Sequence, residues 1–122
     1  MKKKTVLVIE DNDMNMKLIS ALLTIDKYHV LEAVDAEIGI QQAHENKPDL
    51  ILMDIQLPGM DGLSATRIIR QDPVLKDVPV LALSSYAMKI DKEKAQAAGC
   101  TGYITKPIDT RSFLKTIGAY LK

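Results

Sequence analysis

The sequence is poor in features that mark several large classes of protein. Its 122 residues include no tryptophan, one phenylalanine and one cysteine, and 16 basic and 16 acidic residues give a formal net charge of zero. A single cysteine excludes an internal disulfide and suits a reducing, cytoplasmic compartment. The balanced charge gives no electrostatic reason to expect binding to nucleic acid or to a membrane surface.

Long hydrophobic runs are lacking as well. Three lysines at 2–4 lead into an apolar run at 6–9, which is too short for a signal-peptide core or a membrane span. The length suits a single domain, 1–122, and the 47% apolar fraction suits a globular protein with a hydrophobic core. We expect Cys100 to act as a small buried hydrophobe.

Short apolar runs alternate with amphipathic stretches along the chain. The runs lie at 6–9, 29–33, 50–53, 80–83 and 103–105. Three of them are rich in Val, Ile and Leu without polar alternation, which is typical of strands buried on both faces of a parallel sheet. Because parallel neighbours need helical crossovers, five strands alternating with five helices predict an α/β fold with a doubly wound, five-stranded parallel sheet.

Capping residues and the spacing of apolar residues predict where the helices lie. The first should begin after Asn12 or Asp13, and the second should cover 36–46. The fourth, near 89–98, has few large apolar residues and should end at Gly99, and the fifth should begin near Thr110. The predicted buried stripes are Leu18, Ile19, Leu22 and Leu23 in the first helix, Leu63, Ile68 and Ile69 in the third, and Phe113, Leu114, Ile117 and Leu121 in the fifth.

Carboxylates follow two of the predicted strands. Glu10 and Asp11 follow the first run, and Asp54 follows the third. In such sheets the working site lies beyond the carboxyl ends of the strands, where the strand order reverses. Crowded carboxylates repel one another unless a cation or a proton compensates, and an all-oxygen set suits Mg²⁺ rather than zinc. The alternative is that Glu10 and Asp11 only cap the next helix, but the position of Asp54 favours a metal site.

A hydroxyl and an ammonium group are expected at the same edge. Ser84 follows the fourth run, and Lys106 follows the fifth, directly before Pro107. Because a cis bond aims the preceding side chain differently from a trans bond, we predict that the Lys106–Pro107 peptide is cis. An aspartate, a divalent cation, a lysine and a hydroxyl together form a set that handles phosphoryl groups, with Asp54 as the nucleophile.

Six segments in a fixed order carry a family resemblance. They are Val8-Ile9-Glu10-Asp11-Asn12, residues 48–54, residues 57–62, Ala82-Leu83-Ser84, Ala98-Gly99-Cys100 and residues 102–107. Together they span essentially the whole chain and resemble the receiver domains of bacterial two-component response regulators. The stretches 10–18 and 45–50 also resemble DivK-type single-domain regulators, although receivers fused to hybrid kinases carry similar runs. The resemblance implies a flavodoxin- or CheY-like sheet with strand order 2-1-3-4-5.

The resemblance also implies how this edge would work. Asp54 would accept a phosphoryl group from a phosphohistidine on a sensor histidine kinase or a histidine phosphotransfer protein. Asp11 and Asp54 would ligate Mg²⁺ directly, while Glu10 would act mostly through bound water. The backbone carbonyl of Gln56 would complete the metal shell.

The implied switch involves Ser84, Lys106 and Tyr103. Ser84 and Lys106 would hold the phosphoryl oxygens, and Tyr103 takes the position of the family's rotating aromatic residue. If Ser84 is drawn toward the phosphoryl group, Tyr103 can turn into the vacated space and the weakly attached fourth helix can shift. The alternative for Tyr103 is a half-exposed strand aromatic with a wet hydroxyl. Such a protein is a signalling switch rather than an enzyme, because it catalyses only its own phosphotransfer and dephosphorylation.

Four positions depart from the family pattern or tune it. Ser84 stands where threonine is more frequent, and Ser85, where alanine is usual, would narrow access to the acyl phosphate or restrict Tyr103. Gln56 and Tyr86 lie two residues after the phosphoacceptor and the switch hydroxyl, where the family tunes the lifetime of the phosphorylated state. We expect their side chains to hinder the attacking water and prolong the signal.

The sequence also bears on how the protein would pass on its signal and on which other functions are possible. The sequence ends at Lys122 directly after the fifth helix, so we expect output through an unknown protein target. Met88, Ile90 and Tyr103 form a candidate partner face, with scattered surface apolar residues as the alternative. The main rival is a receiver-like scaffolding or relay module, or a fragment of a hybrid kinase, that does not act through its own phosphorylation. A haloacid dehalogenase phosphatase is disfavoured, because it would place a second aspartate where Gln56 stands.

Overall fold

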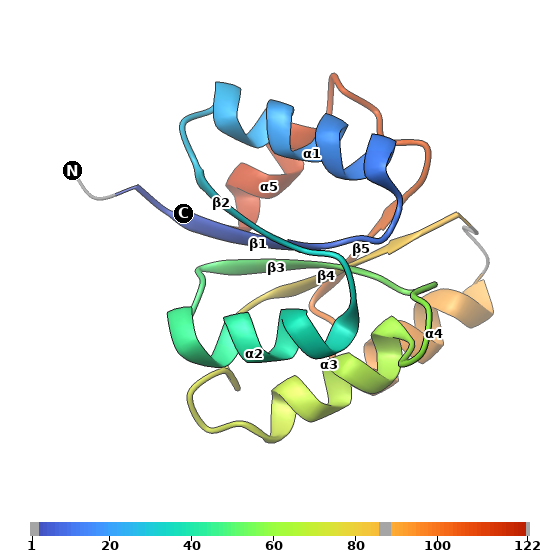
Figure 1. Ribbon diagram of the computed structural model, residues 1–122. Helices are drawn as coiled ribbons and strands as arrows, with labels where there is room; N and C mark the ends of the chain where they lie inside the picture. The colour runs from blue at the N-terminus through green and yellow to red at the C-terminus, as the bar shows by residue number, and fades with distance from the viewer. Residues whose placement is uncertain (1–2, 86–88, 122) are drawn as a thin grey trace.

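Five strands alternate with five helices in the part of the chain that the computed structural model describes, residues 3–85 and 89–121 (Figure 1). For residues 89–91 the description covers the backbone but not the side chains. The strands are β1 (Thr5–Ile9), β2 (His29–Ala33), β3 (Leu50–Asp54), β4 (Val80–Ser84) and β5 (Gly102–Thr105). The helices are α1 (Asp13–Ile25), α2 (Ala36–Asn46), α3 (Gly62–Gln71), α4 (Lys89–Ala98) and α5 (Phe113–Tyr120).

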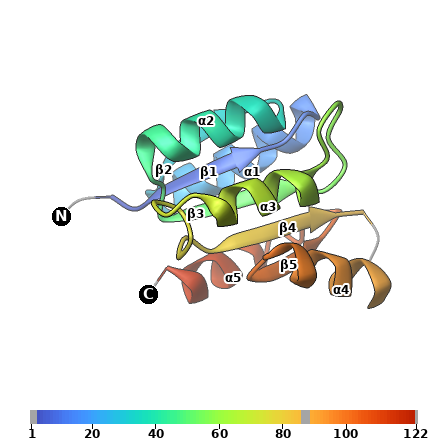
Figure 2. The same ribbon diagram turned by 90° about the horizontal axis from the view of Figure 1, so that it is seen from below.

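The strands form one parallel sheet in the order β2-β1-β3-β4-β5, which confirms the predicted doubly wound fold and its strand order. Helices α1 and α5 cover one face of the sheet, and α2, α3 and α4 cover the other (Figure 1). Figure 2 shows α2, α3 and α4 following one another across the second face. The strand order reverses between β1 and β3, so the carboxyl ends of these two strands border the crevice where such folds bind ligands.

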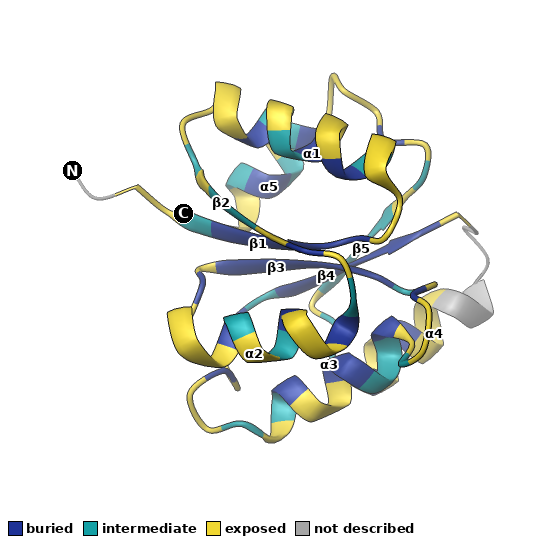
Figure 3. Ribbon diagram, viewed as in Figure 1, coloured by how far each residue is buried: buried dark blue, intermediate teal, exposed yellow. Residues whose placement is uncertain are grey.

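The central strands are buried on both faces, which explains their unbroken apolar runs (Figure 3). Alternate residues of β1 enter two hydrophobic clusters: Leu7 and Ile9 join the one under α2 and α3, and Val6 and Val8 join the one under α1 and α5. The sides of the helices that point away from the sheet are mostly exposed (Figure 3). Among the described residues, no helix combines the length and the apolar character needed to span a bilayer.

In α1 and in α3, one residue that was predicted to be buried is exposed instead. Leu18 was expected to be buried but is 37% exposed, and Met16 lies in the core beside Ile19 instead. In α3, Ile69 is fully buried, whereas Ile68, also predicted to be buried, is 40% exposed. Successive residues of a helix point about 100° apart, so when Ile19 or Ile69 points directly into the core, the preceding residue turns toward solvent.

Local capping fixes the starts of three helices and the end of a fourth. The side chains of Asn12, Asp35 and Asp61 each accept the backbone N–H three residues further along, which starts α1, α2 and α3. Gly99 has a φ of 109° and donates its N–H to the carbonyl of Gln96, so the predicted glycine end of α4 is confirmed. Helix α5 begins later than predicted, because residues 110–112 form a turn instead of a first helical turn.

Arg70, near the end of α3, was not singled out by the sequence but fixes the far end of α4. Its guanidinium group donates to the carbonyl of Gly99 at 2.8 Å and to the hydroxyl of Thr101 at 3.2 Å. It also donates to the carbonyls of Leu75, Lys76 and Val78 at 3.2, 3.1 and 2.7 Å. The C-terminal end of α4 is therefore held to α3 and to the loop before β4.

An ion pair joins α2 to the end of α3. The Nδ1 of His44 lies 2.5 Å from Oδ2 of Asp72, and this hydrogen bond together with the charge of Asp72 raises the pKa of His44. The same contact lowers the pKa of Asp72. Because both groups lie at the surface, we expect a modest contribution to stability that depends on pH.

We expect His44→Gln to lower the melting temperature most near pH 5 to 6 and least above about pH 8. A raised histidine pKa stabilises the fold fully below the unfolded value of about 6.5, and this stabilisation is lost as pH rises through the folded pKa. At still lower pH, Asp72 becomes protonated as the pH falls through its lowered folded pKa, and the ion pair is lost again. Thermal unfolding followed by circular dichroism across this range measures the difference between the two proteins.

Asp72→Asn supplies the control, since asparagine keeps an oxygen that can accept the N–H of Val74, a bond of 2.9 Å in this structure. In the Asp72→Asn background, His44→Gln should have an effect that no longer depends on pH. A pH-independent effect in the wild-type background would contradict the coupling.

Candidate functional site

Three carboxylates meet beyond the ends of β1 and β3. Glu10 and Asp11 directly follow β1, Asp54 is the last residue of β3, and the register pairs Ile9 with Met53. One carboxylate oxygen from each of the three lies within 4.8 Å of the other two. Glu10 is 1% exposed and Asp54 3% exposed, whereas Asp11 is exposed. The parallel register thus brings the predicted residues together, with Asp11 on the side open to solvent.

Lys106 places its ammonium group against two of these carboxylates. Its Nζ lies 2.6 Å from Oε1 of Glu10 and 2.9 Å from Oδ2 of Asp54. The predicted cis peptide between Lys106 and Pro107 is confirmed. The closeness of Lys106 to Asp54 was expected from the sequence, but its shorter contact with Glu10 was not.

The charges of the site are not balanced. Burial raises the pKa of Glu10 to about 7, Asp54 adds to the rise, and Lys106 opposes it. Burial acts against the charge of Lys106, but its contacts with Glu10 and Asp54 outweigh this and raise the pKa of the lysine. Three carboxylates face one ammonium group, so a surplus of negative charge is left for a proton or a cation to offset.

The residues present fit a hard divalent cation. The buried Oε1 of Glu10 faces the ammonium group of Lys106 at 2.6 Å, and no neutral hydrogen-bond donor among the described residues satisfies it. The candidate ligand atoms are all carboxylate oxygens, the donors that Mg²⁺ prefers. The N–H of Gln56 donates to Oδ1 of Asp54 at 2.9 Å and orients that carboxylate. The predicted ligand role of the Gln56 carbonyl stays a prediction.

Ser84 lies at the neighbouring strand end. It closes β4 and is 3% exposed, and its carbonyl accepts the backbone N–H of Lys106 at 2.7 Å. Ser85, which follows, is exposed. Two other predicted residues, Tyr86 and Met88, lie outside the described residues, and the side chain of Ile90 is not described either.

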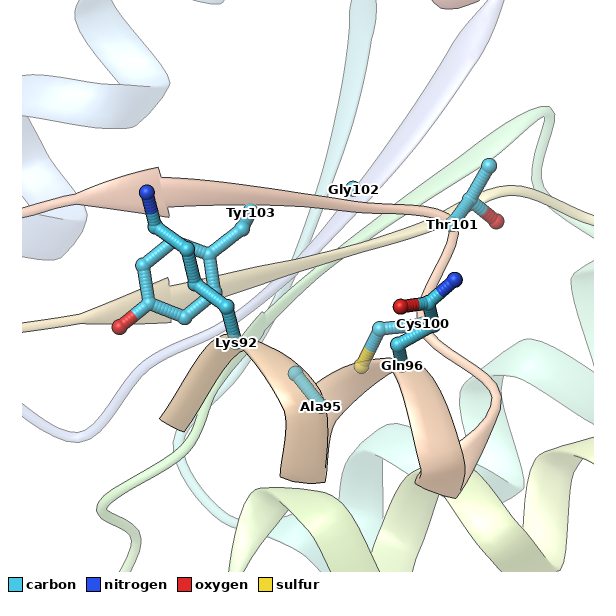
Figure 4. Close-up of a pocket in the computed structure, with 7 residues that line it drawn as sticks. All are labelled: Lys92, Ala95, Gln96, Cys100, Thr101, Gly102 and Tyr103. Carbon is cyan, nitrogen blue, oxygen red and sulfur yellow. The ribbon is translucent and has the colours of Figure 1, made fainter. Parts of the chain in front are cut away.

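Tyr103 lies on β5, away from the carboxylates, and is half-buried. Tyr103 lines two hollows of about 200 Å³ each, one next to α4 and one next to α5. Figure 4 shows the first of these, with Lys92 of α4 lying over the ring of Tyr103. Cys100 also lines this hollow, and it is half-buried instead of fully buried because it sits in the turn after α4 at the margin of the core.

Gly62 brings the start of α3 against the backbone of the phosphoacceptor candidate. Its N–H donates to the carbonyl of Ile55 at 2.9 Å. A Cβ atom at this position would fall on the carbonyl oxygen of Asp54 and lie 2.9 Å from Cα of Ile55. The sequence offered a signal in the glycine that follows the Asp61 cap, but it did not reveal which backbone the glycine approaches.

Comparisons with known proteins agree with this geometry. Residues 6–118 match the family described as the response regulator receiver domain, so the chain belongs to that family of two-component signalling proteins. The polar-differentiation response regulator DivK of Brucella anthropi is 42% identical over 118 residues, which cover 97% of this chain and 96% of DivK. The predicted family and the DivK-type resemblance are confirmed.

Three solved structures are informative relatives. The chemotaxis protein CheY4 of Vibrio cholerae has a TM-score of 0.94 at 27% identity, with 98% of this chain and 100% of CheY4 covered. The receiver domain of the Pseudomonas aeruginosa histidine kinase PA1611, with a magnesium ion coordinated in its active-site cleft, has a TM-score of 0.91 at 32% identity and 98% coverage of both chains. The Saccharomyces cerevisiae Ssk1 receiver, in complex with the phosphotransfer protein Ypd1, has a TM-score of 0.89 at 29% identity, covering 98% of this chain and 89% of that one.

We expect Gly62→Ala to destabilise the fold by about 2–4 kcal/mol, because the added methyl group meets backbone that cannot move without disturbing Asp54. Urea unfolding followed by circular dichroism measures the loss. Gly118→Ala is the matched control, since a Cβ there meets only the hydroxyl of Tyr28, at 4.0 Å. Alanine is the better helix former, so this control should be neutral or stabilise the protein by up to about 1 kcal/mol. Equal effects of the two variants would contradict the close approach.

Proposed function

We propose that residues 1–122 act as a single receiver domain that takes up a phosphoryl group on Asp54 in a Mg²⁺-dependent reaction and signals through contacts with other proteins. The observation that carries this proposal is the position of Asp54, buried beside the ammonium group of Lys106 and facing Glu10 and Asp11. Receiver domains of this family are signalling switches, and DivK, a response regulator, is a relative across nearly the whole chain.

The proposed reaction is attack by a carboxylate oxygen of Asp54 on the phosphorus of a phosphohistidine. A bond between that oxygen and phosphorus forms, the bond from phosphorus to the histidine nitrogen breaks, and the imidazole leaves with its electron pair. Lys106 offsets charge on the phosphoryl oxygens, and the Ser84 hydroxyl donates a hydrogen bond to one of them. Glu10, Asp11, Asp54 and the Gln56 carbonyl would hold Mg²⁺, which when bound neutralises further charge on the transferring group.

The proposed donor is a sensor histidine kinase or a histidine phosphotransfer protein. The complex of the Ssk1 receiver with Ypd1 supports this choice, because it joins a similar receiver to a phosphotransfer protein. The downstream partner would be a protein that reads the face around Met88, Ile90 and Tyr103. Such a module is expected to work in the cytoplasm, where histidine kinases present their phosphorylated domains.

The proposed switch transmits the chemical event from Asp54 to β5. A phosphoryl group adds negative charge and strong acceptors next to Ser84 and Lys106. The Ser84 side chain would move toward it, and Tyr103 would turn into the space released. The population moves only as far as the phosphoryl group stabilises one packing over the other.

Incubation with acetyl phosphate and Mg²⁺, followed by intact-mass measurement, tests the central step. We expect wild type to gain the mass of one phosphoryl group and Asp54→Asn to gain none, because asparagine lacks a nucleophilic carboxylate. Chelation of Mg²⁺ should abolish the gain in wild type. Asp49→Asn is the matched control, since Asp49 binds the N–H of Thr5 at the opposite edge of the sheet and should not matter.

Two results would count against this function. An equal gain in Asp54→Asn would move the site elsewhere, and no gain in wild type with Mg²⁺ would favour a scaffolding module that does not use its own phosphorylation.

The lifetime of the phosphorylated state tests the roles proposed for Gln56 and Tyr86. We expect Tyr86→Ala and Gln56→Ala each to lose the phosphoryl group severalfold faster than wild type, because a smaller side chain admits the attacking water. The Gln56 side chain is exposed, which suits this role. Decay of the phosphorylated mass after removal of acetyl phosphate gives the rate, and Gln41→Ala on the exposed side of α2 serves as control. Unchanged decay in both variants would remove the lifetime assignment.

A further inference from the structure

The ring of Tyr103 is in contact with a charged residue of α4. The Nζ of Lys92 lies 5.8 Å from the centroid of the ring, within the range of a cation–π interaction. Figure 4 shows the lysine side chain reaching from α4 across the hollow to the face of the ring. Lys92 itself is exposed, and Ala95, one turn further along, is buried against the sheet. The contact therefore joins α4 to the strand that carries the proposed switch.

The position of the ring matters for what this contact does. Tyr103 lines the hollow next to α4 and also the hollow next to α5, and the residue is half-buried, so it is not enclosed in the core. Ser84, toward which the ring would turn, is 3% exposed. An ammonium group does not follow the ring into such a space, because loss of its water would cost more than the contact returns.

We propose that Lys92 is a positioning residue for the switch: its ammonium group stabilises Tyr103 at the surface and so opposes the turn toward Ser84. This inference rests on the proposed function, because it assumes that Tyr103 moves when Asp54 is phosphorylated. In this proposal, Lys92 of α4 sets how readily the unphosphorylated domain passes to the packing in which Tyr103 is turned toward Ser84.

Helix α4 is held at its C-terminal end by contacts that do not involve Lys92, so the proposed effect of Lys92 is confined to the other half of the helix. The C-terminal end of the helix is held by the bonds from Arg70 to Gly99 and Thr101. Lys92 lies in the other half of α4, where its contact with Tyr103 joins the helix to β5. Breaking that contact would remove this restraint on the ring, while the bonds from Arg70 still hold the C-terminal end of α4.

Binding of beryllium fluoride with Mg²⁺, a stable mimic of the phosphoryl group, tests the proposal by titration calorimetry. We expect Lys92→Gln to bind it about two- to fivefold more tightly than wild type, the factor that an exposed cation–π contact supplies. Lys92→Arg keeps a cation over the ring and should match wild type. Lys94→Gln makes the same charge change at an exposed position of the same helix, and it should also match wild type.

A second readout follows the ring itself. The chain has four tyrosines and no tryptophan, so 3-fluorotyrosine labelling gives four ¹⁹F signals, of which Tyr103→Phe identifies one. Without beryllium fluoride, the Tyr103 signal of Lys92→Gln should lie closer than that of wild type to the position seen at saturation. In a Tyr103→Leu background, Lys92→Gln should no longer change the affinity.

The outcomes separate this inference from the proposed function. If wild type does not bind beryllium fluoride, the function itself fails. If wild type binds it but Lys92→Gln and Lys94→Gln behave alike, or if the effect of Lys92→Gln persists in Tyr103→Leu, only the role of Lys92 is overturned. An unmoved Tyr103 signal in Lys92→Gln would overturn it equally.

Discussion

The contact of Lys106 with Glu10 and Asp54 is the interaction on which the rest of the site depends. The parallel register holds the ends of β1 and β3 level, so their acidic residues are forced together at one edge. Burying a carboxylate costs several kcal/mol unless a partner compensates, and well-packed apolar residues often do as well or better than a buried ion pair. Stability alone therefore does not account for this cluster, which supports the chemical role proposed for it.

Much of the fold was predictable because a parallel sheet converts position in the sequence into position in space. An unbroken apolar run such as that at 50–53 indicates burial on both faces, and the residue that follows each strand falls on the same edge. Asp54 and Lys106 could therefore be placed near each other without knowledge of any side-chain contact. The end of α4 at Gly99 was equally local, since it depends on one glycine with positive φ.

The features that the sequence did not reveal depend on how each helix is rotated on the sheet and on how deeply individual side chains are buried. The sequence of α1 offers both Met16 and Leu18 as apolar residues that could face the core. Which of the two is buried depends on how the helix is rotated about its axis on the sheet, and no local pattern specifies that rotation. The burial of Glu10 could have been suspected, because it continues the apolar run of β1 with no turn residue between. The contact of Lys92 with Tyr103 had no signal, because it depends on how closely α4 approaches β5.

Because Lys106 is shared between Glu10 and Asp54, uptake of a phosphoryl group on Asp54 would draw the ammonium toward the new charge. The buried Oε1 of Glu10 would then lose its nearest cation, and a proton or a divalent ion would have to take that place. Under the proposed function, cation binding and phosphoryl uptake would therefore favour each other through Glu10. The backbone hydrogen bond from Lys106 to Ser84 would link the same event to the end of β4, so under the proposed switch the charge at Asp54 and the packing around Tyr103 would change together.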